Sequence, residues 1–197
     1  MRRLQEAGLP IFLDLKLHDI PNTVAGAVRA LTPLGLDLMT IHMQGGSAMA
    51  RAAREAAQEA AGKAGVAPPR IVGVTILTSL DGSDLTAMGV PHDPQNQVMR
   101  LAGLAHEAGL DGIVCSPAEL DAVRAAYPKP FTLVVPGLRP AGAAMQDQKR
   151  VRTPEDAAGA GADVLVIGRP ITGATDPAAA AATIAKSVTA RLAESPA

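Results

Sequence analysis

The chain has little cysteine, few aromatic residues and no excess of charge of either sign. Cys115 is the one cysteine among 197 residues, which excludes an intrachain disulfide and a Cys-x-x-Cys metal site. Aromatic residues make up 2% of the chain and tryptophan is absent, so the core must consist of Ala, Val, Leu and Ile. With 18 Lys and Arg against 19 Asp and Glu, the chain has no basic surplus to suggest nucleic acid as a partner.

Long apolar runs are missing as well. No stretch approaches the roughly 20 residues that cross a membrane, and charged residues interrupt the start, where a signal peptide needs an apolar core. We therefore expect a cytoplasmic protein without a membrane partner. The length fits one domain, and no linker or low-complexity segment divides the chain, which predicts a single domain over residues 1–197.

Strand-like and helix-like segments alternate along the whole chain. The strand-like segments are short apolar runs, and Ala-rich helical segments separate them. This alternation predicts an α/β protein with a parallel sheet covered by helices, either a barrel or an open doubly wound sheet. The expected strands are 11–17, 37–42, 70–77, 111–115, 131–135 and 163–167, and the expected helices are 1–8, 23–34, 46–64, 95–109, 117–126, 154–161 and 177–194.

The first predicted strand carries a cluster of charged residues. Successive strand side chains point to opposite faces, so Asp14 and Lys16 share one face, and Asp19 follows where the chain turns into a helix. Charges in an apolar run are costly to bury unless they pair. The cluster is therefore either a structural ion pair or an ammonium held between carboxylates as a positioned proton donor.

Residues 14–23, Asp-Leu-Lys-Leu-His-Asp-Ile-Pro-Asn-Thr, closely resemble the signature of the orotidine 5'-phosphate decarboxylases. The resemblance implies a (β/α)8 TIM barrel of the ribulose-phosphate-binding type. It implies a carboxy-lyase that converts orotidine 5'-phosphate (OMP) to UMP in de novo pyrimidine biosynthesis, with no cofactor. We also expect no metal, because His92 and His106 have no ligand spacing. Lys16 would then protonate C6 of the pyrimidine, and Asp14 would lie near the departing carboxylate and hold Lys16 in place.

The same resemblance implies a homodimer with shared active sites. In this family the residues matching Asp19 and Thr23 are typically lent to the neighbouring subunit's site, and Ile20 lies between them in the substrate-binding stretch. We therefore expect Asp19 to be catalytic and Ile20 and Thr23 to bind substrate.

Four later segments resemble the family at matching positions. Leu-Thr-Ser at 77–79 implies that Thr78 contacts the pyrimidine, although a Thr that satisfies its own turn is the alternative. The segments around Arg139 and Gln148 resemble the family's phosphate loop. Gly168 and Arg169 follow the last predicted strand, where barrels bind phosphate, and the planar guanidinium of Arg169 suits that ligand.

The resemblance also has a gap. A complete barrel has eight βα units and about 250 residues, whereas six units are expected here. The family's first strand, first helix and second strand have no counterpart, including a Lys that pairs with the residue matching Asp14, so we expect an N-terminally incomplete barrel. The alternatives are an inactive nucleotide-phosphate-binding remnant, a metal-dependent sugar-phosphate decarboxylase or aldolase of the same superfamily, and a Schiff-base aldolase using Lys16.

Several other residues are given lesser roles. His42 ends a predicted strand and is interpreted as supporting structure, and we expect a packing role for His18. Cys115 ends a predicted strand and is expected to be a small buried residue. Residues 79–94 and 137–152 are expected to be loops that close over the substrate.

Overall fold

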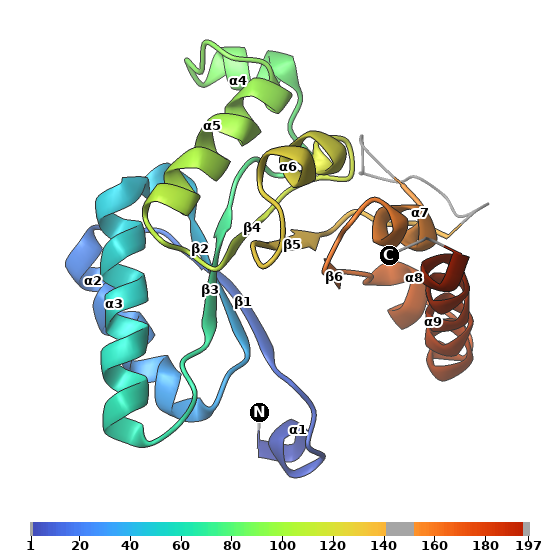
Figure 1. The fold of residues 1–197 in the computed structure, drawn as a ribbon, viewed down its shortest axis with the longest axis horizontal. Coiled ribbons are helices and arrows are strands. Elements are labelled where there is room, and N and C mark those ends of the chain that lie inside the picture. The colour runs from blue at the N-terminus through green and yellow to red at the C-terminus, as the bar shows by residue number, and fades with distance from the viewer. Residues whose placement is uncertain (1, 141–151, 195–197) are drawn as a thin grey trace. The chain divides into compact units, whose positions relative to one another are not determined.

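The computed structural model of the chain describes residues 2–140 and 152–194 (Figure 1). Its contacts divide the chain into two compact units. Unit 1 consists of Met1–Thr75 and Arg100–Ile113, and unit 2 of Ile76–Met99 and Val114–Ala197. The single domain over residues 1–197 stays a prediction. Among the residues described, no helix is both long enough and apolar enough to cross a membrane.

Unit 1 holds the first three strands and the helices that follow the first two. β1 (Phe12–Leu17) pairs in parallel with β2 (Leu38–His42), which pairs in parallel with β3 (Arg70–Val74). The register between β2 and β3 is unbroken. The helical elements are α1 (Arg2–Glu6), α2 (Pro21–Leu31) and α3 (Gly46–Ala64), with 3-10 turns at Thr32–Leu34 and Met43–Gly45; α5 (Pro94–Glu107) and β4 (Gly112–Val114) have residues in both units.

The alanine content of α3 explains how unit 1 forms a core with few aromatic residues. α2 and α3 lie side by side (Figure 1). α3 ends at Gly65, whose φ of 66° suits the left-handed cap that favours glycine. Its buried residues recur every three or four positions, as expected for one helix face, and all but one are alanines: Met49, Ala50, Ala53, Ala56, Ala57, Ala60 and Ala61.

Unit 2 continues the alternation of strands and helices. β5 (Thr132–Val135) is wholly buried and pairs in parallel with β6 (Val164–Leu165). The long α9 (Pro177–Glu194) packs on α7 (Pro154–Gly159) and α8 (Arg169–Thr172). The remaining helices of this unit are α4 (Gly82–Ala87) and α6 (Leu120–Ala126).

A Gly-x-Asp turn recurs before every second strand. It occupies residues 35–37 before β2, 109–111 before β4 and 161–163 before β6, and its glycine has a φ of 65°, 75° and 95° in turn. Each aspartate bonds to one residue of the preceding strand region twice. Its N–H donates to that residue's carbonyl oxygen, and its Oδ2 accepts from the same residue's N–H at 2.7–2.8 Å, for the pairs Asp37–Ile11, Asp111–Ile71 and Asp163–Leu133.

All six predicted strands and all seven predicted helices are present, with small differences at their ends. The predicted helix over 46–64 has those bounds in the structure, and the predicted strand over 70–77 ends at Val74. Two short helices, α4 and α8, were not predicted. Residues 79–94 are therefore not a plain loop, since α4 begins there with a capping box in which Asp81 and Asp84 each accept from the other's main chain.

Candidate active site

The pairing of β1 with β2 is irregular where β1 carries its charges. Leu13 lies opposite Met39 and Leu17 opposite Ile41, so Asp14, Leu15 and Lys16 all lie opposite Thr40. Within this bulge Lys16 has a φ of 52°. Among the described residues other than glycine, Lys16 alone has a positive φ. A left-handed conformation costs an ordinary residue about 1–2 kcal/mol, and such strain concentrates at functional sites.

Three side chains form one network at this bulge. The Lys16 ammonium donates to Asp14 Oδ2 at 2.5 Å, so the two residues pair. The hydroxyl of Thr40 donates to Asp14 Oδ1 at 2.8 Å and accepts the main-chain N–H of Lys16 at 2.9 Å. Thr40 is fully buried, whereas the side chains of Lys16 and Asp14 are 39% and 41% exposed. Exposed ion pairs stabilise a fold little, so this pair contributes little to stability. Its exposure leaves it accessible to a substrate.

Asp19, Ile20 and Thr23 lie just beyond this network. The Asp19 carboxylate accepts the main-chain N–H of Ile20 at 2.7 Å, and among the described residues the carboxylate that pairs with Lys16 is that of Asp14. The described part of the chain therefore does not place Lys16 between two carboxylates. Ile20 is 67% exposed, and Thr23 is exposed in the first turn of α2. The contribution of these three residues to a neighbouring subunit stays a prediction.

Two histidines stack beside the network. The rings of His18 and His42 have centroids 5.3 Å apart at an interplanar angle of 28°. His42 Nδ1 is buried and has no hydrogen-bond partner in the part of the chain that the structure describes. Burial lowers the pKa of His42, and the charges of His18 and Lys16 lower it further. The neutral form of His42 is therefore favoured next to the ammonium of Lys16.

We expect the free energy of unfolding to fall as the pH drops below about 6.5. The folded-state pKa of His42 lies below its ordinary value of 6.5, so the unfolded chain binds a proton first and gains stability relative to the fold. His42→Phe keeps a ring against His18 and removes the titration. Urea unfolding of both proteins between pH 7.5 and 5.5 should show a flatter profile for the variant, and equal slopes would contradict this origin of the acid sensitivity.

The candidate phosphate residues lie in unit 2. Gly168 caps α8 by accepting the N–H groups of Ile171 and Thr172 at 2.9 and 3.0 Å, and Arg169 begins that helix with an exposed side chain. A Cβ added to Gly168 would meet no atom within 4 Å, and its φ is −95°. Packing within the described chain therefore does not require a glycine here.

The other substrate residues of unit 2 have different surroundings. Thr78 is half-buried three residues before Asp81 and the α4 cap. Arg139 is 8% exposed. Its side-chain Nη1 donates to the carbonyl oxygen of Leu138 at 3.0 Å, and its main-chain N–H donates to the carbonyl oxygen of Arg152 at 3.1 Å. Gln148 and most of the predicted closing loop over 137–152 lie outside the described residues. The substrate contacts of Thr78, Arg139 and Gln148 stay predictions.

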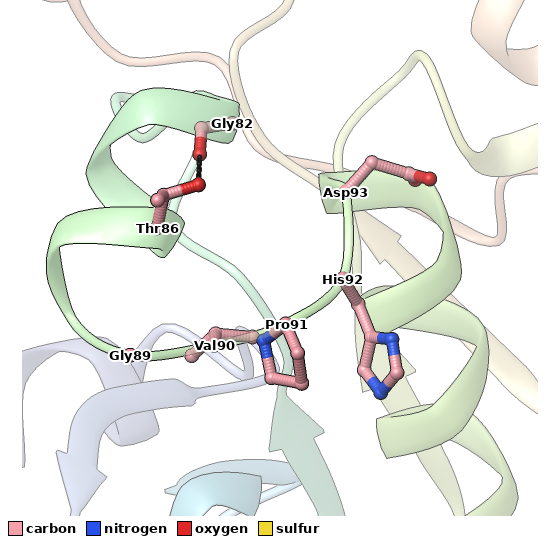
Figure 2. Close-up of a pocket in the computed structure, with 7 residues that line it drawn as sticks. All are labelled: Gly82, Thr86, Gly89, Val90, Pro91, His92 and Asp93. Carbon is pink, nitrogen blue, oxygen red and sulfur yellow. Dashed lines mark hydrogen bonds between the residues drawn. The ribbon is translucent and has the colours of Figure 1, made fainter.

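A cavity of about 540 Å³ lies between α4 and the start of α5 (Figure 2). Its polar groups are used locally: the Thr86 hydroxyl donates to the carbonyl oxygen of Gly82, and Asp93 caps α5 by accepting the N–H of Asn96 at 2.9 Å. None of the predicted site residues lines it, so we assign it no ligand. Its lining residues are Gly82, Thr86, Gly89, Val90, Pro91, His92 and Asp93.

Sequence reasoning missed Thr40. In the sequence it is one Thr in an apolar strand, and nothing local distinguishes it from a residue that packs. Cys115 is buried, as expected. Within the described ranges, no group of three His, Cys, Asp or Glu residues is placed to hold a metal ion.

Comparisons with known proteins agree on one family. Residues 1–184 match the sequence model of the family described as orotidine 5'-phosphate decarboxylase / HUMPS. The orotidine 5'-phosphate decarboxylase of Rhodospirillum rubrum is 59% identical over 177 residues, which cover 90% of this chain and 72% of that protein. The one from Paramagnetospirillum magneticum is 54% identical over 184 residues, covering 93% of this chain and 78% of that protein.

A solved structure gives the same answer for the fold. The crystal structure of orotidine 5'-phosphate decarboxylase from Lactobacillus acidophilus has a TM-score of 0.81 and 37% sequence identity, and the match covers 95% of this chain and 79% of that one. This likeness, with six strands that alternate with helices, confirms the predicted fold class of an incomplete TIM barrel with about six βα units.

Proposed function

The chain belongs to the orotidine 5'-phosphate decarboxylase / HUMPS family, and from that membership we propose that it decarboxylates OMP to UMP in pyrimidine biosynthesis. The observation that carries the proposal is the Lys16 ammonium, bonded to Asp14 at 2.5 Å from a strained backbone position. Release of CO2 from OMP, measured with and without EDTA, tests it. Binding of UMP without turnover would indicate a remnant, and a requirement for Mg²⁺ would indicate a metal-dependent relative.

In the proposed reaction the bond between C6 and the carboxylate breaks and its electron pair stays on C6. A positive charge held where negative charge develops lowers the barrier, and the Lys16 ammonium lies at such a point. It then donates its proton to C6, which completes UMP as CO2 leaves. Asp14 holds the ammonium by its Oδ2. In this proposal Asp14 would lie beside the departing carboxylate, and no cofactor takes part.

The resemblance to the family suggests which residues bind the rest of the substrate. Arg169 and Gly168 would bind the phosphate, with Arg139 and Gln148, and Thr78 would contact the pyrimidine. Binding energy from a phosphate remote from the reacting carbon can accelerate the reaction when it is expressed in the transition state. The exposed Arg169 supports this assignment, because its guanidinium presents a planar pair of donors that fits phosphate oxygens.

Arg169→Ala should lower kcat/KM for OMP by about 10- to 100-fold, the cost of losing hydrogen bonds between charged groups. A substrate that lacks the phosphate serves as the control. Turnover of orotidine, which has no phosphate, should be the same for the variant and the unchanged protein. An equal loss for both substrates would mean that Arg169 supports the fold instead of binding phosphate.

We further propose that the protein works in the cytoplasm as a homodimer whose subunits share active sites. The exposure of Ile20 and Thr23 supports this, since both follow the catalytic strand and are accessible to a second copy. Asp19 is exposed beside them and would complete the neighbouring subunit's site.

A further inference from the structure

We propose that Thr40 is a positioning residue, which sets both the backbone of Lys16 and the carboxylate of Asp14. The inference rests on the proposed function, and it adds a residue of a different strand to the machinery. Thr40 contacts neither the reacting carbon nor the phosphate in this proposal. It acts through the two residues to which it bonds.

The geometry of the hydroxyl carries the argument. Thr40 lies in the middle of β2 with no exposed surface, opposite the three-residue bulge of β1. A hydroxyl has one proton to donate, and this one goes to Asp14 Oδ1 at 2.8 Å. Its oxygen accepts the N–H of Lys16 at 2.9 Å. With Oδ1 held by Thr40, the other oxygen of Asp14 is directed to the Lys16 ammonium at 2.5 Å.

The strained conformation of Lys16 makes this contact consequential. In a regular pair of strands the N–H of Lys16 would bond to the main chain of β2, whereas in the bulge it bonds to a side chain. Without that acceptor, nothing in the network offsets a φ of 52°. A return toward extended backbone changes the register of β1, and a slip of one residue turns a side chain to the opposite face. The ammonium would then leave Asp14.

Thr32 provides a matched control within the same unit. It is also fully buried, and its hydroxyl donates to the carbonyl oxygen of Val28 at 2.8 Å, at the end of α2. Thr32→Val and Thr40→Val therefore remove the same group from equally buried positions. Thr40→Val removes hydrogen bonds to Lys16 and Asp14, whereas Thr32→Val removes a hydrogen bond to one helix carbonyl.

The experiment compares Thr40→Val, Thr40→Ser and Thr32→Val by kcat, KM, affinity for UMP and melting temperature. Thr40→Val should lower kcat by about 100-fold, the loss that a misplacement of about 1 Å can cause, with affinity for UMP within about threefold of normal. Thr40→Ser keeps the hydroxyl and should restore most of kcat. Thr32→Val should lower the melting temperature about as much as Thr40→Val and leave kcat unchanged.

A second measurement does not depend on turnover. Lys16 released from Asp14 loses the hydrogen bond that occupies its side-chain nitrogen and is more accessible to an acylating reagent, so its labelling relative to the exposed Lys186, read by peptide mass spectrometry, should rise in Thr40→Val. Thr40→Ser should label as the unchanged protein does. If the unchanged protein decarboxylates no OMP, the proposed function fails, and this labelling alone decides the role of Thr40.

Two results would overturn the inference. The first is Thr40→Val with kcat within twofold of normal, or, in an inactive protein, with unchanged labelling of Lys16. The second is a Thr40→Val protein that loses UMP affinity together with kcat and melts far below Thr32→Val, which would make the residue structural.

Discussion

Replacing Lys16 with alanine is expected to lower kcat for OMP by at least about 10³-fold, because the change removes both the proton donor and the positive charge beside C6. Binding of UMP should remain measurable, since the proposed phosphate residues lie elsewhere in the chain. The reason is visible in the bulge of β1, where the ammonium is the cation next to Asp14. Steady-state turnover and UMP titration check the two halves of the expectation.

Lys63→Ala serves as the control for the charge. Lys63 is an exposed lysine of the same unit, paired with Glu59 at 2.6 Å, and its removal should leave kcat unchanged. Near-normal turnover of Lys16→Ala would remove Lys16 from its role. Mixing Lys16→Ala with Asp19→Ala extends the test to the shared site, because a mixed dimer has one site with both residues, and up to about a quarter of normal activity should return. No recovery would contradict subunit sharing.

Replacing Arg124 with alanine should lower the free energy of unfolding by about 1–3 kcal/mol, the usual cost of leaving buried hydrogen-bonding groups without a partner. Its guanidinium donates to the carbonyl oxygens of Gly161, Tyr127 and Phe131 at 2.8–3.1 Å and to Asp163 at 2.5 Å. The side chains of Arg124 and Asp163 are 16% and 21% exposed, so water cannot replace these bonds fully.

Arg124→Lys should recover little of this stability. The single ammonium of a lysine cannot reach all the acceptors that the planar guanidinium of Arg124 contacts along its different edges. Arg29→Ala is the control: the ion pair of Arg29 with Glu59 is exposed, and losing it should change the free energy of unfolding little. Urea unfolding followed by circular dichroism measures all three. A loss for Arg124→Ala no larger than that for Arg29→Ala would contradict the importance of this cluster.

The sequence predicted the Asp14–Lys16 pair, but by a mechanism that differs from the observed one. Strict alternation along β1 would place both side chains on one face, whereas the structure brings them together through a bulge with Lys16 at a φ of 52°. Periodicity within one strand contains no information about such a bulge. Thr40, which bonds to Lys16 in this bulge, is 24 residues away from Lys16 in the chain. A contact between residues so far apart depends on how the two strands pair.

The short helices show a different limit. α4 and α8 have six and four residues, too few for a 3.6-residue pattern to be recognised. For α4 a local signal did exist, because Asp81 and Asp84 have the three-residue spacing of a capping box. The long α3 was predicted to the residue because its Ala-rich pattern extends over five turns and ends at a glycine.

The Gly-x-Asp turns also indicate where this chain can be divided. Each turn connects the beginning of an even-numbered strand to the odd-numbered strand before it. Two strands and the helical segment between them therefore form a module, which the hydrogen bonds of the turn's aspartate hold together. A cut or a circular permutation placed between modules, as in residues 65–69, leaves every aspartate with the strand that it holds. A cut inside a module separates the two, and recombination between relatives is therefore best tolerated at boundaries that fall after every second strand.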